Sequence, residues 1–209
     1  PPSTAFFKLD IDDLEIRKQG QEALQSEIDK GLRTIENALM SEIEVSNDRV
    51  AMFEALKHLV VSGNVLLYLT DKGLKVYPLS KFVCKRDEVG NVLEILIKET
   101  VHPQALPLEF LELIKKKENY DADMMKGDLD IYTSIKRMND DFFWFQECKG
   151  EKIPNTDGRS KIDVTPFIPL RFIRVDGEDY GRGYVEEYRG DLISLESLMQ
   201  AIIEGAAAS

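Results

Sequence analysis

The sequence predicts an α+β fold with N-terminal helices, antiparallel β-hairpins that form a meander with a short helix, and a long C-terminal helix. Apolar residues recur with helical spacing at both ends of the chain, whereas between about residues 65 and 175 they form short runs bounded by Gly, Pro, Asn and Asp. With 209 residues, 43% of them hydrophobic, the chain can bury a sizeable core. We place one α+β domain at residues 1–176 and a turn with a helix at 177–209.

Two helices are predicted before the first strand. Acidic residues favour helix N-termini, so Asp10, Asp12 and Asp13 predict the start of a helix that reaches about Val45. Its apolar stripe consists of Leu24, Ile28, Leu32, Ile35, Leu39 and Ile43.

The second helix is expected to begin at a cap, Asn47 or Asp48, and to end at about Ser62, before Gly63. The residues expected to face inward are Met52, Phe53, Leu56, Leu59 and Val60. The first third of the chain is therefore expected to form a helical hairpin or elbow.

The middle of the chain predicts antiparallel hairpins separated by turn residues. Four segments, which we expect to form one meander, are Val65–Thr70, Leu74–Tyr77, Phe82–Arg86 and Val92–Thr100. A third hairpin is expected at Leu129–Arg137 and Phe142–Cys148, a turn-rich loop at Ile153–Ile162 and an edge or terminal strand at Ile168–Val175. A short helix at about Leu108–Lys117 should bury Phe110, Leu111 and Ile114.

The aromatic run Phe142–Phe145 has two interpretations. It could stack on nucleic-acid bases, but Arg and Lys are not interleaved with it. Core and sheet packing is the interpretation that we favour.

The C-terminal helix carries two different stripes. A bulky apolar seam recurs at steps of three and four, and it consists of Val185, Tyr188, Leu192, Leu195, Met199 and Ile202. Small residues lie across the helix, and they are Gly190, Ser194, Ser197 and Ala201. A helix with these two faces can contact one neighbour on each side, as in a ring of identical helices. The alternative is a single amphipathic helix that covers its own domain.

Net charge and cysteine usage narrow the possible functions. A formal charge of −11 argues against wrapping nucleic acid over the surface. Cys84 and Cys148 lie far apart and are expected to be reduced core residues. The longest apolar run, Val65–Leu69, is far shorter than the ~20 residues that span a bilayer, so we expect no membrane segment. Because the chain begins with Pro1, we expect a segment of a longer protein.

Motifs for catalysis and cofactor binding are sparse. The sequence has no P-loop, and its two histidines, His58 and His102, have no zinc-ligand spacing. We expect no metal, cofactor or enzymatic activity. The alternative is a metal-dependent hydrolase or nuclease that uses the acidic cluster of Asp176, Glu178, Asp179 and Asp191. The simpler interpretation of that cluster is a polar strand-to-helix turn in which Asp179 caps the helix.

Two long stretches resemble a known family. They are "MFEALKHLVVSGNVLLYL" at Met52–Leu69 and "PFIPLRFIRVDGEDYGRGYVEEYRGDLISLESLMQAI" at Pro166–Ile202, with "RDEVGNVLEI" at Arg86–Ile95 between them. They resemble the head-to-tail connector, or portal, proteins of short-tailed bacteriophages.

This resemblance implies a homododecameric ring at one capsid vertex, made in the host cytoplasm, through which double-stranded DNA enters and leaves the capsid. The implied partners are the terminase motor, the capsid, a tail adaptor and internal core proteins. The segment up to about Asp176 resembles the wing, and Tyr184–Ala208 resembles the first stem helix around the channel. The second stem helix, clip and crown have no counterpart in these residues.

An acidic channel wall should let DNA slide without binding it tightly, because it offers no counterion release. The channel-lining candidates are Glu186, Glu187 and Glu204, towards the small-residue side of the helix.

Overall fold

The computed structural model describes residues 7–10, 22–46, 48–118 and 127–207, without the side chains of residues 22–25 and 115–118. The chain divides into two compact units, residues 1–52 and residues 53–209. The boundary predicted after residue 176 lies inside the second unit and stays a prediction.

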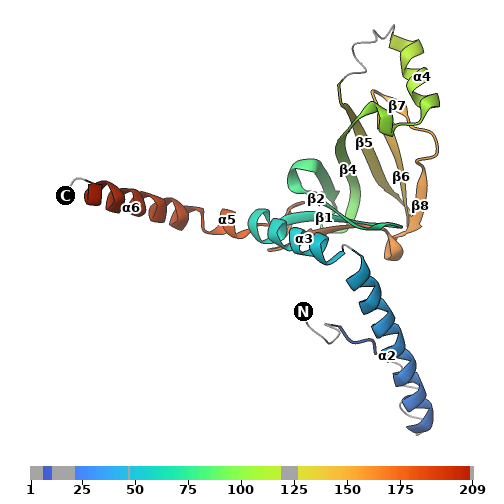
Figure 1. Ribbon diagram of the computed structural model, residues 1–209, viewed down its shortest axis with the longest axis horizontal. Coiled ribbons are helices and arrows are strands. Elements are labelled where there is room, and N and C mark those ends of the chain that lie inside the picture. Colours follow the sequence, from blue (N-terminus) through green and yellow to red (C-terminus); the bar gives the residue numbers. More distant parts are fainter. Residues whose placement is uncertain (1–6, 11–21, 47, 119–126, 208–209) are drawn as a thin grey trace. The chain divides into compact units, whose positions relative to one another are not determined.

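Helix α2 (Glu22–Val45) dominates the first unit and ends at the predicted residue (Figure 1). Its predicted start is described only at Asp10, which precedes the helix, while Asp12 and Asp13 lie outside the described residues. The backbone N–H of Leu9 donates to Oε1 of Glu36 at 2.6 Å. The described stripe is half-buried at Ile28, Leu32 and Ile43 and exposed at Ile35 and Leu39.

Helix α3 (Asp48–Ser62) also has the predicted bounds. The N–H of Asp48 donates to the hydroxyl of Ser46 at 3.4 Å, and Asn47 lies outside the described residues. Gly63 ends the helix with a φ of +76°, in the left-handed region that glycine adopts at little cost.

The predicted inward face of α3 is wrong. Met52, Phe53, Leu56 and Val60 are exposed, whereas Ala55 is buried and packs with Val65 and Leu67. Leu59 is half-buried against the same cluster. Apolar residues lie on most sides of this helix, and the small alanine lets its backbone approach the sheet closely.

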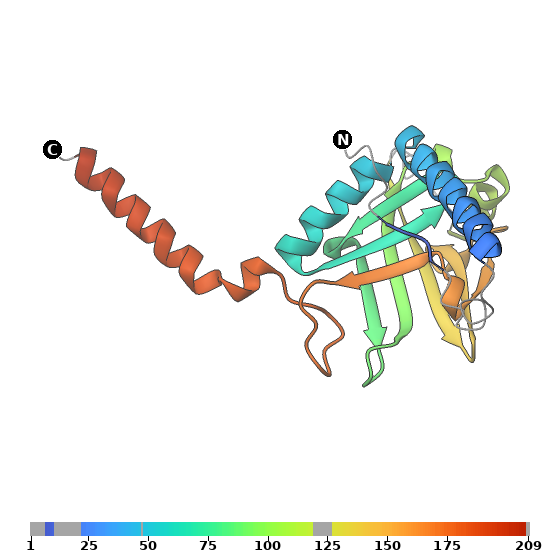
Figure 2. The ribbon, with the colours of Figure 1, turned by 90° about the horizontal axis from the view of Figure 1, so that it is seen from below.

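The first sheet in the second unit is antiparallel and has the strand order β2-β1-β9 (Figure 2). Its strands are β1 (Asn64–Thr70), β2 (Gly73–Pro78) and β9 (Phe167–Arg171). The predicted hairpin around Asp71-Lys72 is confirmed. The strand predicted at Ile168–Val175 is an edge strand as expected, but it begins at Phe167 and already ends at Arg171. Leu66 pairs with Pro169, which an edge strand tolerates.

The second sheet continues as a meander, β3-β4-β5-β6-β7, with β8 beside β6. Its strands are β3 (Phe82–Arg86), β4 (Val92–Val101), β5 (Leu129–Met138), β6 (Asp141–Cys148), β7 (Glu151–Lys152) and β8 (Gly158–Lys161). The first four predicted strands therefore do not form one meander, because β1 pairs with the distant β9 and draws its hairpin into a separate sheet. The predicted loop at 153–162 contributes β8.

The two sheets share one core. Leu66 of β1 and Phe167 of β9 lie in the same buried cluster as residues of the second sheet, among them Ile95, Ile135 and Phe142. On the outer face of the first sheet, Val65 and Leu67 pack with Ala55 of α3. The second unit is therefore layered as α3, first sheet, second sheet.

Helix α4 (Leu108–Glu118) covers the end of the second sheet. The predicted burial of Phe110, Leu111 and Ile114 is confirmed. They pack with Leu129 and Ile131 of β5, which gives the second sheet a smaller core of its own.

The aromatic run of β6 divides between the two faces of the strand. Phe142 is buried, and Trp144 packs edge-on against Phe167 with ring centroids 5.3 Å apart. On the other face Phe143 lies beside the guanidinium of Arg159, which β8 supplies. The predicted core packing is thus confirmed for Phe142 and Trp144. On the opposite face the cation beside Phe143 is Arg159, which lies outside the aromatic run.

None of the described helices combines the length and the apolar composition needed to span a bilayer.

Candidate functional site

The Gly-rich segment after β9 folds back on itself before the C-terminal helix begins. Ile173 and Arg182 form an isolated antiparallel bridge, with N–H···O distances of 3.1 and 2.9 Å. Between them Gly177 turns the chain with a φ of +74°. This bridge brings residues 181–183 beside the end of α3.

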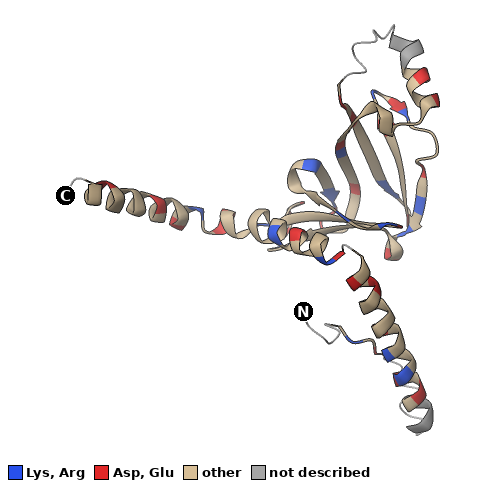
Figure 3. Cartoon of the chain, in the orientation of Figure 1, with Lys and Arg blue, Asp and Glu red and all other residues tan. Residues whose placement is uncertain are grey.

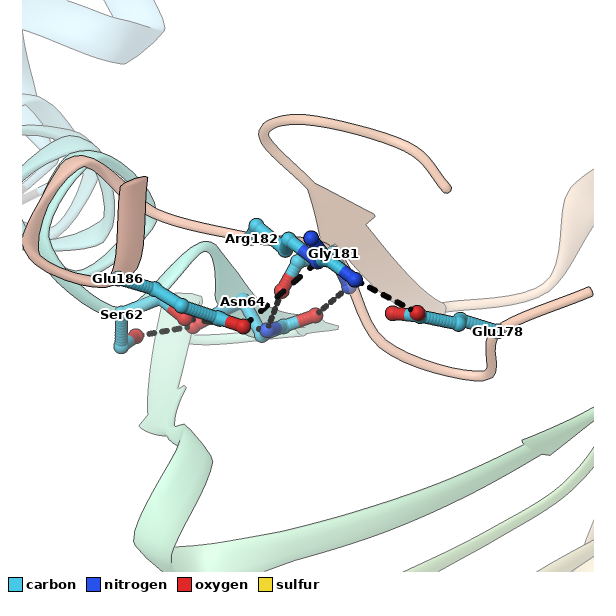
Figure 4. A network of polar contacts seen from close by, with 6 residues as sticks. All are labelled: Ser62, Asn64, Glu178, Gly181, Arg182 and Glu186. Atoms are coloured by element: carbon cyan, nitrogen blue, oxygen red, sulfur yellow. Dashed lines mark hydrogen bonds and ion pairs between the residues drawn. The ribbon is translucent and has the colours of Figure 1, made fainter. Parts of the chain in front are cut away.

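Asn64 holds this segment through both ends of its amide group. Its Nδ2 donates to the carbonyl of Gly181 at 2.6 Å, and its Oδ1 accepts from the N–H of Gly181 at 2.7 Å (Figure 4). Nδ2 also donates to the carbonyl of Ser62 at 3.1 Å. Asn64 is only 3% exposed. The amide group thus pairs with both the N–H and the carbonyl of buried Gly181, so its loss would leave these two backbone groups unpaired.

The two backbones cross so closely that only glycine fits. A methyl group on Gly63 would lie 2.3 Å from the carbonyl carbon of Arg182 and 2.4 Å from the nitrogen of Gly183. A methyl group on Gly183 would lie 2.3 Å from the carbonyl oxygen of Val61. We call this crossing of residues 61–64 with residues 181–183 the joint.

The same segment contacts the second sheet through β3. The N–H of Cys84 donates to the hydroxyl of Tyr180 at 3.0 Å, and the N–H of Arg86 donates to Oδ1 of Asp179 at 2.6 Å. The Arg86 guanidinium donates to the carbonyls of Asp179, Gly90 and Pro169, each at 3.0 Å. The segment is therefore attached to both sheets.

The suggested capping role of Asp179 is wrong. The residue at the cap of α5 (Tyr184–Glu187) is Gly183, which makes no side-chain cap, and the carboxylate of Asp179 binds β3 instead. Glu178 pairs with Arg182 at 2.9 Å, and this hydrogen bond raises the pKa of Arg182. Asp176 and Asp191 are exposed. Among the described residues, no group of three or more His, Cys, Asp or Glu side chains could hold a metal ion.

The C-terminal helix consists of two pieces. α5 is followed by α6 (Arg189–Ala207), and Tyr188 between them has a φ of −106° and a ψ of 19°, outside the helical region. Tyr184 of α5 contacts the residue that follows β9, because its ring lies edge-on to that of Phe172 with centroids 5.0 Å apart. The long helix predicted from Tyr184 therefore has a break that Gly190, a poor helix former, could have indicated.

The described residues leave the apolar seam of this helix uncovered. All side chains from Tyr184 to Ala207 are exposed, and those of the seam are 47–62% exposed. Packing of the helix onto its own domain, the alternative interpretation, is therefore not observed. Three further bulky residues were missed by the spacing argument, and they are Ile193, Leu198 and Ile203. At about 100° per residue Leu198 and Ile203 widen the seam, while Ile193 lies apart from it.

The small-residue face keeps its hydroxyl groups occupied. Ser194 donates to the carbonyl of Gly190 and Ser197 to that of Ile193, each at 2.9 Å. Both hydroxyl protons are thus used within the helix, so another backbone could approach this face without leaving a donor unpaired.

The channel-lining candidates do not lie on one continuous helix. Glu186 belongs to α5 and lies 3.6 Å from Arg182, while Glu204 belongs to α6 and accepts a hydrogen bond from Gln200 at 2.9 Å. Glu187 is exposed on α5. Red segments of the cartoon in Figure 3 mark the Asp and Glu positions along these helices. Their role in a channel stays a prediction.

Comparison with known proteins identifies the family. Residues 1–209 match the family described as bacteriophage head to tail connecting protein. The chain belongs to this family. It is 38% identical over 215 aligned positions to the portal protein of Escherichia phage T7 and 36% identical over 211 to that of Enterobacteria phage T3, with 97% of the chain covered in both. The portal protein of Enterobacteria phage SP6 is 29% identical over 221 positions, with 99% of the chain covered.

The chain spans about two fifths of the length of these portal proteins: 39% for T7 and T3, and 41% for SP6. Membership of the connector family agrees with the predicted resemblance and with the α+β architecture. The hydrolase alternative finds no support in the family or in the geometry of the described acidic residues.

Proposed function

We propose that this connector-family chain is part of a structural portal subunit that forms a ring at one capsid vertex. Double-stranded DNA would pass through the ring during packaging and ejection. The observation that carries the proposal is the apolar seam of α5 and α6, which is exposed in the chain. Burying such a seam is favourable by ~1.5–3 kcal/mol for each fully buried large side chain, and in the proposed ring an adjacent subunit covers it.

The same reasoning assigns the two helix faces to two neighbours. The bulky seam of one copy packs against an adjacent subunit, and the small-residue face lets a neighbouring backbone come close. From the resemblance to portal proteins we propose a dodecameric ring located in the virion. Residues 1–176 form the wing and 177–209 lead into the stem. The terminase motor, capsid, tail adaptor and internal core proteins are the proposed partners.

Leu195→Glu in the full-length protein that carries this chain tests the seam. Leu195 is 53% exposed, so the substitution should change subunit stability by less than about 0.5 kcal/mol. In a ring it would bury an unpaired charge at a cost of about 3–5 kcal/mol per contact. The association constant should fall by a factor of about 10² to 4 × 10³, because about 1.4 kcal/mol is tenfold.

Sedimentation velocity measures the ring yield, and circular dichroism checks the fold. Val164→Glu is the matched control, because Val164 is 71% exposed and lies away from the helix. Rings should be lost only in the Leu195 variant. A full ring yield from that variant would refute the seam as an intersubunit surface.

Weak DNA binding follows from the charge of −11. We expect this 209-residue chain to bind duplex DNA no better than about millimolar at physiological salt, weaker than ordinary non-specific binders at ~10⁻⁴–10⁻⁶ M. Filter binding measures this. Salt-sensitive retention at micromolar protein would contradict it.

A further inference from the structure

We propose that Asn64 is a positioning residue that fixes the direction of the C-terminal helix relative to the two sheets, and so determines where the seam meets the next subunit. The importance for assembly rests on the proposed ring. The positioning itself is a property of one chain.

The first step is the nature of the contact. Asn64 begins β1, and Gly181 lies 117 residues later, two residues before the cap of α5. Both partners are buried, and the amide makes hydrogen bonds of 2.6 and 2.7 Å to the two polar groups of one residue. Two such bonds fix an orientation as well as a distance, which a single contact would not do.

The second step is the absence of other support further along the helix. The aromatic contact at Tyr184 holds α5, but every described side chain from Arg189 to Ala207 is exposed. Within the described residues, the direction of α6 is therefore set before Arg189, by the joint and by the turn at Tyr188.

The third step is the length of α6, which converts a small change of direction into a large displacement of its far end. The 19 residues of α6 span about 28 Å at 1.5 Å per residue. A tilt of about 10° at the joint would move the far end sideways by about 5 Å, roughly half of the ~8–10 Å between the axes of packed helices. Such a displacement would break the packing of the seam on a neighbouring helix.

The chemistry of the contact distinguishes Asn from its isostere. Asn64→Asp keeps the size and the acceptor towards the N–H of Gly181. It loses the donor to the carbonyls of Gly181 and Ser62, and it places a carboxylate oxygen where Nδ2 lies 2.6 Å from the Gly181 carbonyl oxygen. The joint should therefore open while the sheet pairings stay intact.

The test measures a distance distribution in the full-length protein that carries this chain. Spin labels on cysteines at Lys85 of β3 and Glu196 of α6, both exposed, are diluted with unlabelled subunits and measured by pulsed electron resonance. We expect one narrow distance in the parent protein, and a distribution at least twice as broad, with a loss of rings, in the Asn64→Asp variant.

Thr133→Val is the matched control, because buried Thr133 accepts a hydrogen bond from Gln146 within the second sheet. It should leave the distance narrow. An equally narrow distance in folded Asn64→Asp would overturn the proposal.

If Asn64→Asp does not fold, Gly181→Ala tests the same contact from the other side. A methyl group there would lie 2.8 Å from Cβ of Arg171 and 3.0 Å from the carbonyl oxygen of Gly63, which pushes the partner away from an intact Asn64. A broadened distance supports the proposal, and a narrow one overturns it. If the parent protein forms no rings, the ring proposal fails, but the distance measurement still decides the role of Asn64.

Discussion

Gly63→Ala should destabilise the chain far more than the same substitution at Gly150. Both glycines have a φ of +76°, so alanine is strained equally at both, by about 1–2 kcal/mol. At Gly150 a methyl group would meet nothing within 4 Å, whereas at Gly63 it would lie 2.3–2.7 Å from three backbone atoms of residues 181–183. Overpacking of this kind typically costs a further ~1–3 kcal/mol. The expected losses in unfolding free energy are therefore about 2–5 kcal/mol for Gly63→Ala and about 1–2 kcal/mol for Gly150→Ala.

Urea unfolding of the 209-residue chain measures both losses. Trp144 is its only tryptophan and packs against Phe167 between the two sheets, so its fluorescence reports on the shared core. The difference between the two variants isolates the close approach at the joint from the backbone strain. Losses that agree within about 0.5 kcal/mol would refute the packing argument.

Two further predictions concern the second sheet. Arg159 donates a hydrogen bond of 2.6 Å to Asp141, and this bond, followed by the contact with Lys161, lowers the pKa of Asp141 below its ordinary value of 3.8. The ion pair therefore stabilises the fold above pH 3.8, and this stabilisation is lost as the pH falls through the lower pKa of the folded state. In the Asp141→Asn variant, the free energy of unfolding should fall less steeply between pH 6 and pH 2 than in the parent chain. An equally steep fall would argue against a stabilising ion pair at Asp141. Phe110→Ala, which removes a fully buried side chain of α4, should lower the free energy of unfolding in urea by about 3–5 kcal/mol. Phe53→Ala, at 61% exposure, should cost far less, and equal costs would contradict the burial argument.

Local signals account for most of the elements that the sequence predicted correctly. Gly63 marks the end of α3, and Asp71-Lys72 lies at the turn of the first hairpin. Alternation and turn residues depend on a few neighbouring positions, so they can be read without knowing the partner strand.

The errors arise where a distant segment decides the outcome. β1 pairs with β9, about 100 residues away, and this pairing separates the two sheets. Ala55 of α3 is buried because β1 lies beneath it, and no periodicity distinguishes it from its larger apolar neighbours. Asp179 is a residue type that often caps helices, but it lies four residues before the cap Gly183, and its carboxylate accepts from the N–H of Arg86 on β3.

The candidate assembly surface was only partly predictable. The six seam residues could be named from their spacing in the sequence, although Val185 belongs to α5, Tyr188 lies at the break, and only the other four belong to α6. Their exposure required coordinates, and so did the break at Tyr188. Asn64 gave no sequence signal, since a single asparagine between a glycine and a strand is usually read as part of a turn.

The contacts from Tyr180 and Asp179 to β3 also have a consequence for solubility. β3 is the outermost strand of its sheet, and the N–H groups of Cys84 and Arg86 point away from β4. Unpaired groups on such an edge invite strands from other molecules and so promote aggregation. The tyrosine hydroxyl and the aspartate carboxylate occupy these donors. These two contacts therefore protect this edge of the sheet from pairing with strands of other molecules.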